Sequence, residues 1–209
     1  MDIEYYGANC FRISNKKASL VTDDNLDQLG VKSVIKSDDI ELRTFVSESS
    51  APKGRMMIDQ PGEYEVSGVS VIGIAARAHM DEPNAKTTTI YKVVIDDIKI
   101  AITGHIYPEL SDDQLESIGT VDVLLIPLGG SGYTMDATGA LKIIRKIEPK
   151  IVIPSHYADK VLRYEVPQQD LEGALKDLAM EPKERTAKLK LKSANIPVDG
   201  TQLIILERQ

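Results

Sequence analysis

Short apolar segments separated by polar turns dominate the first half of the chain. They lie at residues 3–6, 10–14, 19–22, 40–46, 56–59, 62–66, 69–76, 87–95 and 98–103. Segments of this length that are rich in Val, Ile, Thr and Tyr predict β-strands, and Gly, Pro, Asn and Asp between them predict turns. Two pairs of neighbouring segments enclose only two polar residues each and are therefore predicted to form β-hairpins: 62–66 with 69–76, and 87–95 with 98–103.

The pattern changes in the second half, where longer apolar runs alternate with helical spacing. The runs at 121–127, 151–154 and 203–206 are apolar apart from Asp122, which is typical of strands covered on both faces. Helices are predicted over residues 111–118, 136–147 and 167–178, with a capping box at Ser111 and Gln114 and an N-cap at Asp136. No linker or repeat interrupts the chain. We therefore expect a single domain over residues 1–209, with two mixed sheets and helices on the outer faces.

Composition and charge narrow the range of partners. The net charge of -7 disfavours binding to nucleic acid, and no apolar run approaches the roughly 20 residues of a membrane span. The N-terminal segment lacks the features of a signal peptide, and the single cysteine, Cys10, fits a reducing compartment. A cytoplasmic protein without nucleic-acid or membrane partners is expected, and a homo-oligomer is left open. Cys10 itself is expected to be a buried small apolar residue.

The three histidines of the chain each follow an apolar run. His79 follows residues 69–76, His105 follows 98–103, and His156 follows 151–154. Ligands bind beyond the carboxyl ends of strands in open α/β sheets, and imidazole is a common metal ligand. The histidines are therefore candidates for one shared metal site. The alternative is three unrelated histidines that hydrogen-bond to nearby carbonyl groups.

Several sequence blocks, taken in order, resemble the metallo-β-lactamase-fold hydrolases, in the small branch akin to the ascorbate-phosphate lactonases. The blocks are GANCFR at 7–12, PGEYEV at 61–66 with the run to His79, VDVLLIPLGG at 121–130, YTMD at 133–136 and PKIVIPSHY at 149–157. The resemblance spans nearly the whole chain. It implies an αββα sandwich with its site at one edge of the two sheets.

The chain departs from the family pattern at the metal ligands. The family carries His-x-His-x-Asp-His in one loop, and alignment from Asp39 places four other residues at those positions: Phe45, Ser47, Ser49 and Ser50. Ala8 stands where the branch often has a histidine, and His105 stands where the family has a bridging Asp. Serine hydroxyls are poor replacements for these ligands, so the resemblance implies that the usual dinuclear site is lost.

Two functional interpretations follow. The favoured one is a non-catalytic or ligand-binding protein, without a cofactor, that holds a small molecule in the cleft at the sheet edge. The alternative is a metal-dependent hydrolase with a rebuilt mononuclear site, in which His79, His105 and His156 bind one zinc ion and leave a fourth position for water.

Other residues near the inferred cleft are weaker candidates. Asp23, Asp81 and Asp136 are each candidates to orient a histidine, against the alternative of a loop or cap carboxylate. The loop at 47–54 is expected to line the cleft without binding metal. Lys53 and Arg55 are candidates to attract an anion, although charges in such loops are usually solvated.

Overall fold

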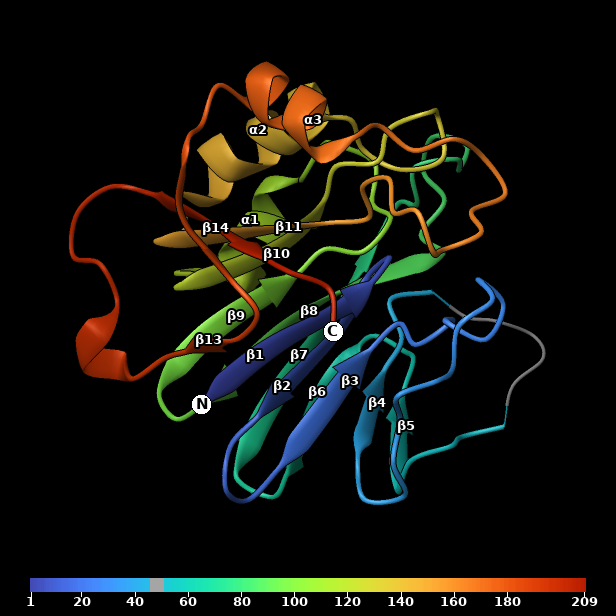
Figure 1. Cartoon of the computed structure of the whole chain (residues 1–209). Coiled ribbons are helices and arrows are strands. Elements are labelled where there is room, and N and C mark those ends of the chain that lie inside the picture. Colours follow the sequence, from blue (N-terminus) through green and yellow to red (C-terminus); the bar gives the residue numbers. More distant parts are fainter. Residues whose placement is uncertain (46–50) are drawn as a thin grey trace.

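The computed structural model, described for residues 1–45 and 51–209, contains two facing β-sheets (Figure 1). The six-stranded sheet has the order β13-β1-β2-β3-β4-β5, and the eight-stranded sheet has the order β12-β14-β11-β10-β9-β8-β7-β6. The strands of the first are β1 (Asp2–Gly7), β2 (Cys10–Ser14), β3 (Ser19–Thr22), β4 (Ile40–Leu42), β5 (Met56–Ile58) and β13 (Leu189–Lys190). Those of the second are β6 (Gly62–Val66), β7 (Val69–Ala76), β8 (Thr88–Ile95), β9 (Ile98–Ile102), β10 (Val123–Pro127), β11 (Ile151–Ser155), β12 (Pro182–Thr186) and β14 (Gln202–Leu206). Both sheets mix parallel and antiparallel pairs, as predicted.

The main core lies between the two sheets, and a second core lies behind the larger one. Strand β10 is buried along its whole length because its side chains alternate between these two cores. Val123 and Leu125 face the inter-sheet core, whereas Leu124 and Ile126 pack in the second core with the helices. This arrangement explains the continuous apolar run that predicted the strand.

Three helices cover the outer face of the eight-stranded sheet: α1 (Asp112–Ile118), α2 (Ala137–Ile147) and α3 (Leu171–Leu178) (Figure 1). The caps predicted for α1 and α2 are present. Gln114 N–H donates to the Ser111 hydroxyl, and Gly139 N–H donates to the Asp136 carboxylate at 2.7 Å. The prediction for α3 was wrong at its start. Asp170 accepts from Gly173 N–H at 2.9 Å and caps the helix there, so residues 167–169 remain outside it.

The outer face of the six-stranded sheet carries irregular chain rather than helices in the part that the structure describes. A third apolar cluster seals this face, formed by Ala8, Cys10, Val21, Leu26, Leu29 and Leu162. The two-sheet sandwich expected from the resemblance is confirmed, and its fourth layer consists of these packed loops. Cys10 is fully buried, and burial raises the pKa of its thiol, so the thiol stays protonated.

Strand boundaries differ from the predictions in a few places. The segment 40–46 forms a strand only at β4; Phe45 makes an isolated bridge to Thr88, and Val46 lies outside the described residues. Strand β12 was not predicted, because its sequence is polar and lacks apolar alternation. Within the described residues, no helix combines the length and apolar character that crossing a membrane requires.

Candidate functional site

The three histidines lie at the same edge of the sandwich. Strands β7, β9 and β11 end on this edge, and His79, His105 and His156 follow them. The His79 backbone N–H donates to the His105 carbonyl at 2.7 Å. The ring centroids of His105 and His156 are 4.6 Å apart, with the two rings nearly perpendicular. Segments far apart in the sequence therefore deliver these imidazoles to one place.

Aromatic rings surround the imidazoles. Phe45 lies edge-on to His105 with ring centroids 6.3 Å apart, and Tyr133 lies 5.0 Å from His105. Tyr164 lies 5.0 Å from His156. His105 and His156 thus pack within a chain of ring contacts that runs from Phe45 to Tyr164, whereas His79 contacts the ring of Tyr107.

Two small cavities open beside this ring cluster. One, of about 150 Å³, is lined by Phe45, Ala78, His79, Met80, His105 and Tyr133. The other, of about 80 Å³, includes His156 and is lined largely by polar side chains. Tyr133 lines both cavities and is 43% exposed. The first cavity is mainly apolar and the second mainly polar, so the two suit different chemical groups.

Backbone geometry and one amide fix the orientation of His156. His156 has φ +53 and donates its backbone N–H to the Ala8 carbonyl at 2.9 Å. Its Nδ1 lies 3.1 Å from Gln168 Oε1, and the Gln168 amide nitrogen donates to the Val166 carbonyl at 2.9 Å. With the amide in this orientation, Oε1 must accept, so Nδ1 carries the proton. The Nε2 lone pair of a neutral His156 therefore remains available to a ligand or metal.

The contact between Gln168 and His156 requires a glycine at position 129. A Cβ on Gly129 would come within 2.0 Å of Gln168 Oε1 and 2.2 Å of the His156 carbonyl oxygen. No larger residue fits there without moving the amide that orients the imidazole.

Asp23 organises the segment that reaches His105. Its carboxylate accepts from both the backbone N–H and the hydroxyl of Thr44, each at 2.7 Å. Thr44 in turn packs so closely on Gly104 that a Cβ there would lie 2.3 Å from the Thr44 hydroxyl oxygen. Burial raises the pKa of Asp23 to about 6, although the two hydrogen bonds from Thr44 oppose the shift. Asp23 thus holds Thr44, and with it Phe45, rather than orienting a histidine.

Burial also determines the charge of the histidines. It lowers the pKa of His105 to about 3, and repulsion from His156 contributes to the same shift. Burial lowers the pKa of His79 and His156 as well. All three are therefore neutral at pH 7, the form in which imidazole binds metals. The Nδ1 atoms of His79 and His105 are buried and lack a hydrogen-bond partner among the described residues.

The donors in the described part of the chain do not form a metal-binding group. Among residues 1–45 and 51–209, no three His, Cys, Asp or Glu side chains are placed so that they could hold a metal. Phe45, at a position where the resemblance has a liganding histidine, offers only an apolar ring. Ser47, Ser49 and Ser50, at the other loop positions, lie outside the described residues.

The remaining candidates from the sequence serve local structure. The Asp81 carboxylate accepts from Ala78 N–H at 3.0 Å, and Asp136 caps α2. The Lys53 ammonium pairs with Asp27 at 2.6 Å, and the Arg55 guanidinium donates to the Ser67 hydroxyl. Lys53 and Arg55 are not among the residues that line the two cavities.

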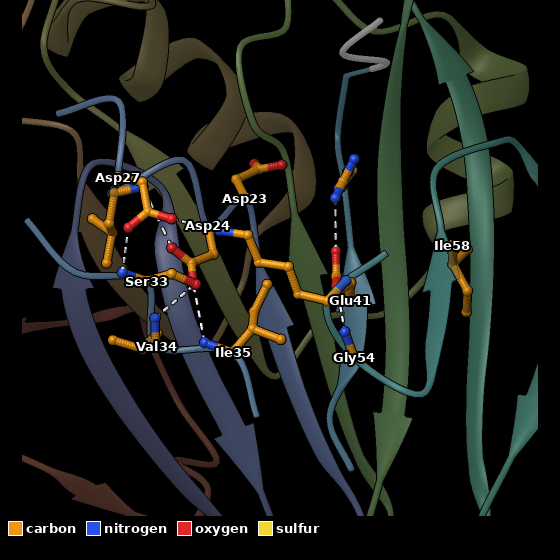
Figure 2. Close-up of polar contacts among 12 residues, drawn as sticks. Asp23, Asp24, Asp27, Ser33, Val34, Ile35, Glu41, Gly54 and Ile58 are labelled. Atoms are coloured by element: carbon orange, nitrogen blue, oxygen red, sulfur yellow. Dashed lines mark hydrogen bonds and ion pairs between the residues drawn. The ribbon is translucent and has the colours of Figure 1, made fainter. Parts of the chain in front are cut away.

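Two anchoring carboxylates went unnoticed in the sequence. Glu41 is buried in β4 and accepts from the backbone N–H groups of Lys53 and Gly54; the Gly54 bond is 2.6 Å (Figure 2). Asp24 accepts from the N–H groups of Val34 and Ile35 (Figure 2). The charged residue between Ile40 and Leu42 was the available signal for Glu41. These bonds tie down the chain that follows the loop and the chain that precedes β4.

This sandwich, with its site at one edge, defines a metallo-β-lactamase-type protein. The family model of the "Beta-lactamase superfamily domain" matches residues 2–156, and the chain belongs to this superfamily. A "putative Zn-dependent hydrolase of the metallo-beta-lactamase superfamily" from Thermotoga maritima has a similar structure, with a TM-score of 0.78 and 25% identity. That likeness covers 100% of this chain and 99% of the other.

Curated relatives match over shorter segments. The "UPF0173 metal-dependent hydrolase" of Carboxydothermus hydrogenoformans is 49% identical over 43 residues, which cover 21% of this chain and 19% of the relative. A "UPF0173 metal-dependent hydrolase" of Pyrococcus horikoshii is 31% identical over 100 residues, which cover 46% of this chain and 44% of the relative. A "UPF0173 protein" of Pyrococcus abyssi is 27% identical over 183 residues, or 75% of this chain and 83% of the relative. The matches to the first two relatives thus span less than half of their length.

Proposed function

We propose that this chain is a member of the superfamily that has lost the dinuclear site and does not carry out two-metal hydrolysis. It instead binds a small molecule in the cleft at the histidine edge, as a cytoplasmic protein. One observation carries the proposal: Phe45 packs edge-on against His105, and both occupy positions that the resemblance assigns to metal ligands. An apolar ring thus lies against the imidazole where the family places charged and imidazole ligands.

The chemistry of the family explains why the replacement of these metal ligands would abolish hydrolysis. Two-metal hydrolysis relies on one ion to polarise the substrate and on a bridging hydroxide to attack it. Without the loop histidines and the carboxylates, neither ion is held, and water is not activated at neutral pH. The buried, neutral histidines then act as polar groups within an aromatic pocket.

A second candidate function is a mononuclear zinc hydrolase built on His79, His105 and His156. The observation that favours it is the pair of buried Nδ1 atoms without partners, at His79 and His105. Nitrogens that share one zinc ion lie about 3–3.5 Å apart, because Zn–N bonds are about 2.0–2.1 Å. The His105 and His156 rings pack closely and His79 lines a cavity with His105, but the three imidazoles are not placed to hold one ion, so this candidate requires them to move closer together when zinc binds.

An activity assay tests the main proposal. Untagged protein is supplied with Zn²⁺ or Mn²⁺ and assayed with an aryl phosphodiester, a lactone and a β-lactam. We expect turnover no higher than that of the His156→Ala variant, because no pair of metals activates water. Turnover that disappears on chelation and on His156→Ala would overturn the proposal. Turnover that withstands chelation would overturn both candidate functions.

A further inference from the structure

The polar cavity beside His156 is built from separate parts of the chain. Asn25 and Gln28 come from the turn after β3, and Arg163 and Tyr164 come from the segment between β11 and α3. The cavity volume is about 80 Å³. A water molecule takes up roughly 30 Å³ in the liquid, so the space holds two or three waters or a ligand of a few heavy atoms.

Arg163 presents an unpaired guanidinium at this cavity. Its backbone N–H donates to the Leu29 carbonyl at 3.0 Å. Its side chain lies along the turn, since a Cβ on Gly30 would come within 3.2 Å of Arg163 Cδ and 3.4 Å of Nε. Within the described part of the chain, the guanidinium makes no ion pair or hydrogen bond. A held but unpaired guanidinium at a concave site is suited to a carboxylate or phosphate.

Two further groups complement an oxyanion that also carries a hydroxyl. The Tyr164 oxygen accepts from Ala8 N–H at 3.2 Å, which leaves its own proton free to donate. Burial raises the pKa of Tyr164, so this proton is retained at neutral pH. Asn25 lines the cavity, but its Oδ1 is closed off from solvent and lacks a donor among the described residues, so the Asn25 amide must turn towards the cavity for a ligand to reach this atom. An unmet buried acceptor is costly, and a hydroxyl on the ligand would satisfy it.

The charges around the cavity favour a monoanion. Arg163 and Glu165 both line it and are both exposed, and the neighbouring His156 is neutral. With one cation and one carboxylate the lining has no net charge, so an anion is held only by direct contact with Arg163, and a second negative charge on the ligand would add repulsion from Glu165.

We propose that this cavity binds a small hydroxy-monocarboxylate, with its carboxylate on Arg163 and Tyr164 and its hydroxyl donating to Asn25. This inference rests on the proposed function and names the class of its ligand.

Binding of simple probes tests the inference. Wild-type protein is titrated by calorimetry with glycolate, with acetate, which lacks the hydroxyl, and with inorganic phosphate. We expect glycolate to bind more tightly than either of the others. Arg163→Gln should weaken glycolate binding about tenfold or more, because a charge-assisted pair is lost. Asn25→Ala should remove the preference for glycolate over acetate.

Matched controls keep the result interpretable. Arg145→Gln removes the same charge from an exposed position on α2 and should leave binding unchanged. Thermal melting should be unaltered in Arg163→Gln, because its side chain makes no bond that folding needs. Equal affinity for glycolate and acetate, tighter binding of phosphate, or insensitivity to Arg163→Gln would each overturn the inference. These results would leave the proposed function standing, since that depends on the absence of two-metal hydrolysis.

Discussion

Burial of His105 among aromatic rings makes the stability of the folded protein depend on pH. The pKa of His105 is about 3 in the folded protein, against an ordinary value of 6.5. Between pH 3 and 6.5 the unfolded chain binds a proton at His105 that the folded chain does not. The contribution of His105 to the free energy of unfolding is therefore complete above about pH 6.5 and is lost as the pH falls towards 3. Asp23 acts in the opposite sense, because its raised pKa favours the protonated folded state and costs stability as the pH rises from about 4 to 6.

The variant His105→Gln separates these contributions. Chemical unfolding of metal-free wild type and variant is measured from pH 4 to 7, and Asp23 contributes equally to both. We expect the wild type to lose roughly 1.4 kcal/mol more per pH unit than the variant below pH 6. Equal slopes would show that His105 is protonated in the fold and that the ring cluster does not exclude its charge.

Gly129 provides a second prediction at the residue scale. Gly129→Ala places a Cβ against Gln168 Oε1 and the His156 carbonyl, so we expect a loss of about 2–3 kcal/mol in the free energy of unfolding. Gly132→Ala is the matched control. No atom lies within 4 Å of its added Cβ, so only the strain of its positive φ, about 1 kcal/mol, applies. Similar losses in the two variants would argue against the close contact of Gln168 with Gly129.

At the scale of elements, hydrogen bonds hold both flanks of the loop that carries the family's ligand positions. Asp23 holds Thr44 on one side, and Glu41 holds Lys53 and Gly54 on the other. These anchors keep the flanks of the loop in place. The anchored flanks make it reasonable to restore the metal ligands by substitution.

The restored variant combines Phe45→His, Ser47→His, Ser49→Asp, Ser50→His and His105→Asp. We expect it to gain bound zinc relative to wild type, as measured by elemental analysis after dialysis against buffered zinc. Adding His156→Ala to this background should reduce the gain. Failure of the restored variant to take up zinc would mean that the backbone of the loop has also left the family geometry.

Across the whole molecule, the reliability of the sequence predictions follows from how local each signal is. The β8–β9 hairpin was predicted from two residues, Asp96 and Asp97, and both have the positive φ that its tight turn needs. Strand β12 was missed because it is a polar edge strand that pairs only with β14. The start of α3 was placed too early because Asp170 decides it rather than Pro167.

The site residues follow the same rule: those with a local signal in the sequence could be predicted, and those that depend on contacts between distant segments could not. The histidines could be found because each directly follows an apolar run. The cavity with Arg163 and Asn25 could not, since it exists only where two loops far apart in sequence meet. The role of Asp23 was left open between orienting a histidine and serving as a loop carboxylate, and its bonds to Thr44 could not be foreseen because Thr44 follows a different strand, β4.

Metal stoichiometry tests the central claim most directly. Untagged protein is purified without chelators, dialysed, and analysed for zinc, manganese and iron per chain, before and after incubation with excess Zn²⁺. Because the described donors do not form a metal-binding group, we predict no stoichiometric metal in either sample. One tightly bound zinc that is lost in His156→Ala would replace the main proposal by the mononuclear alternative. Two tightly bound ions per chain would contradict the account, because they would mean that a dinuclear site exists in this protein.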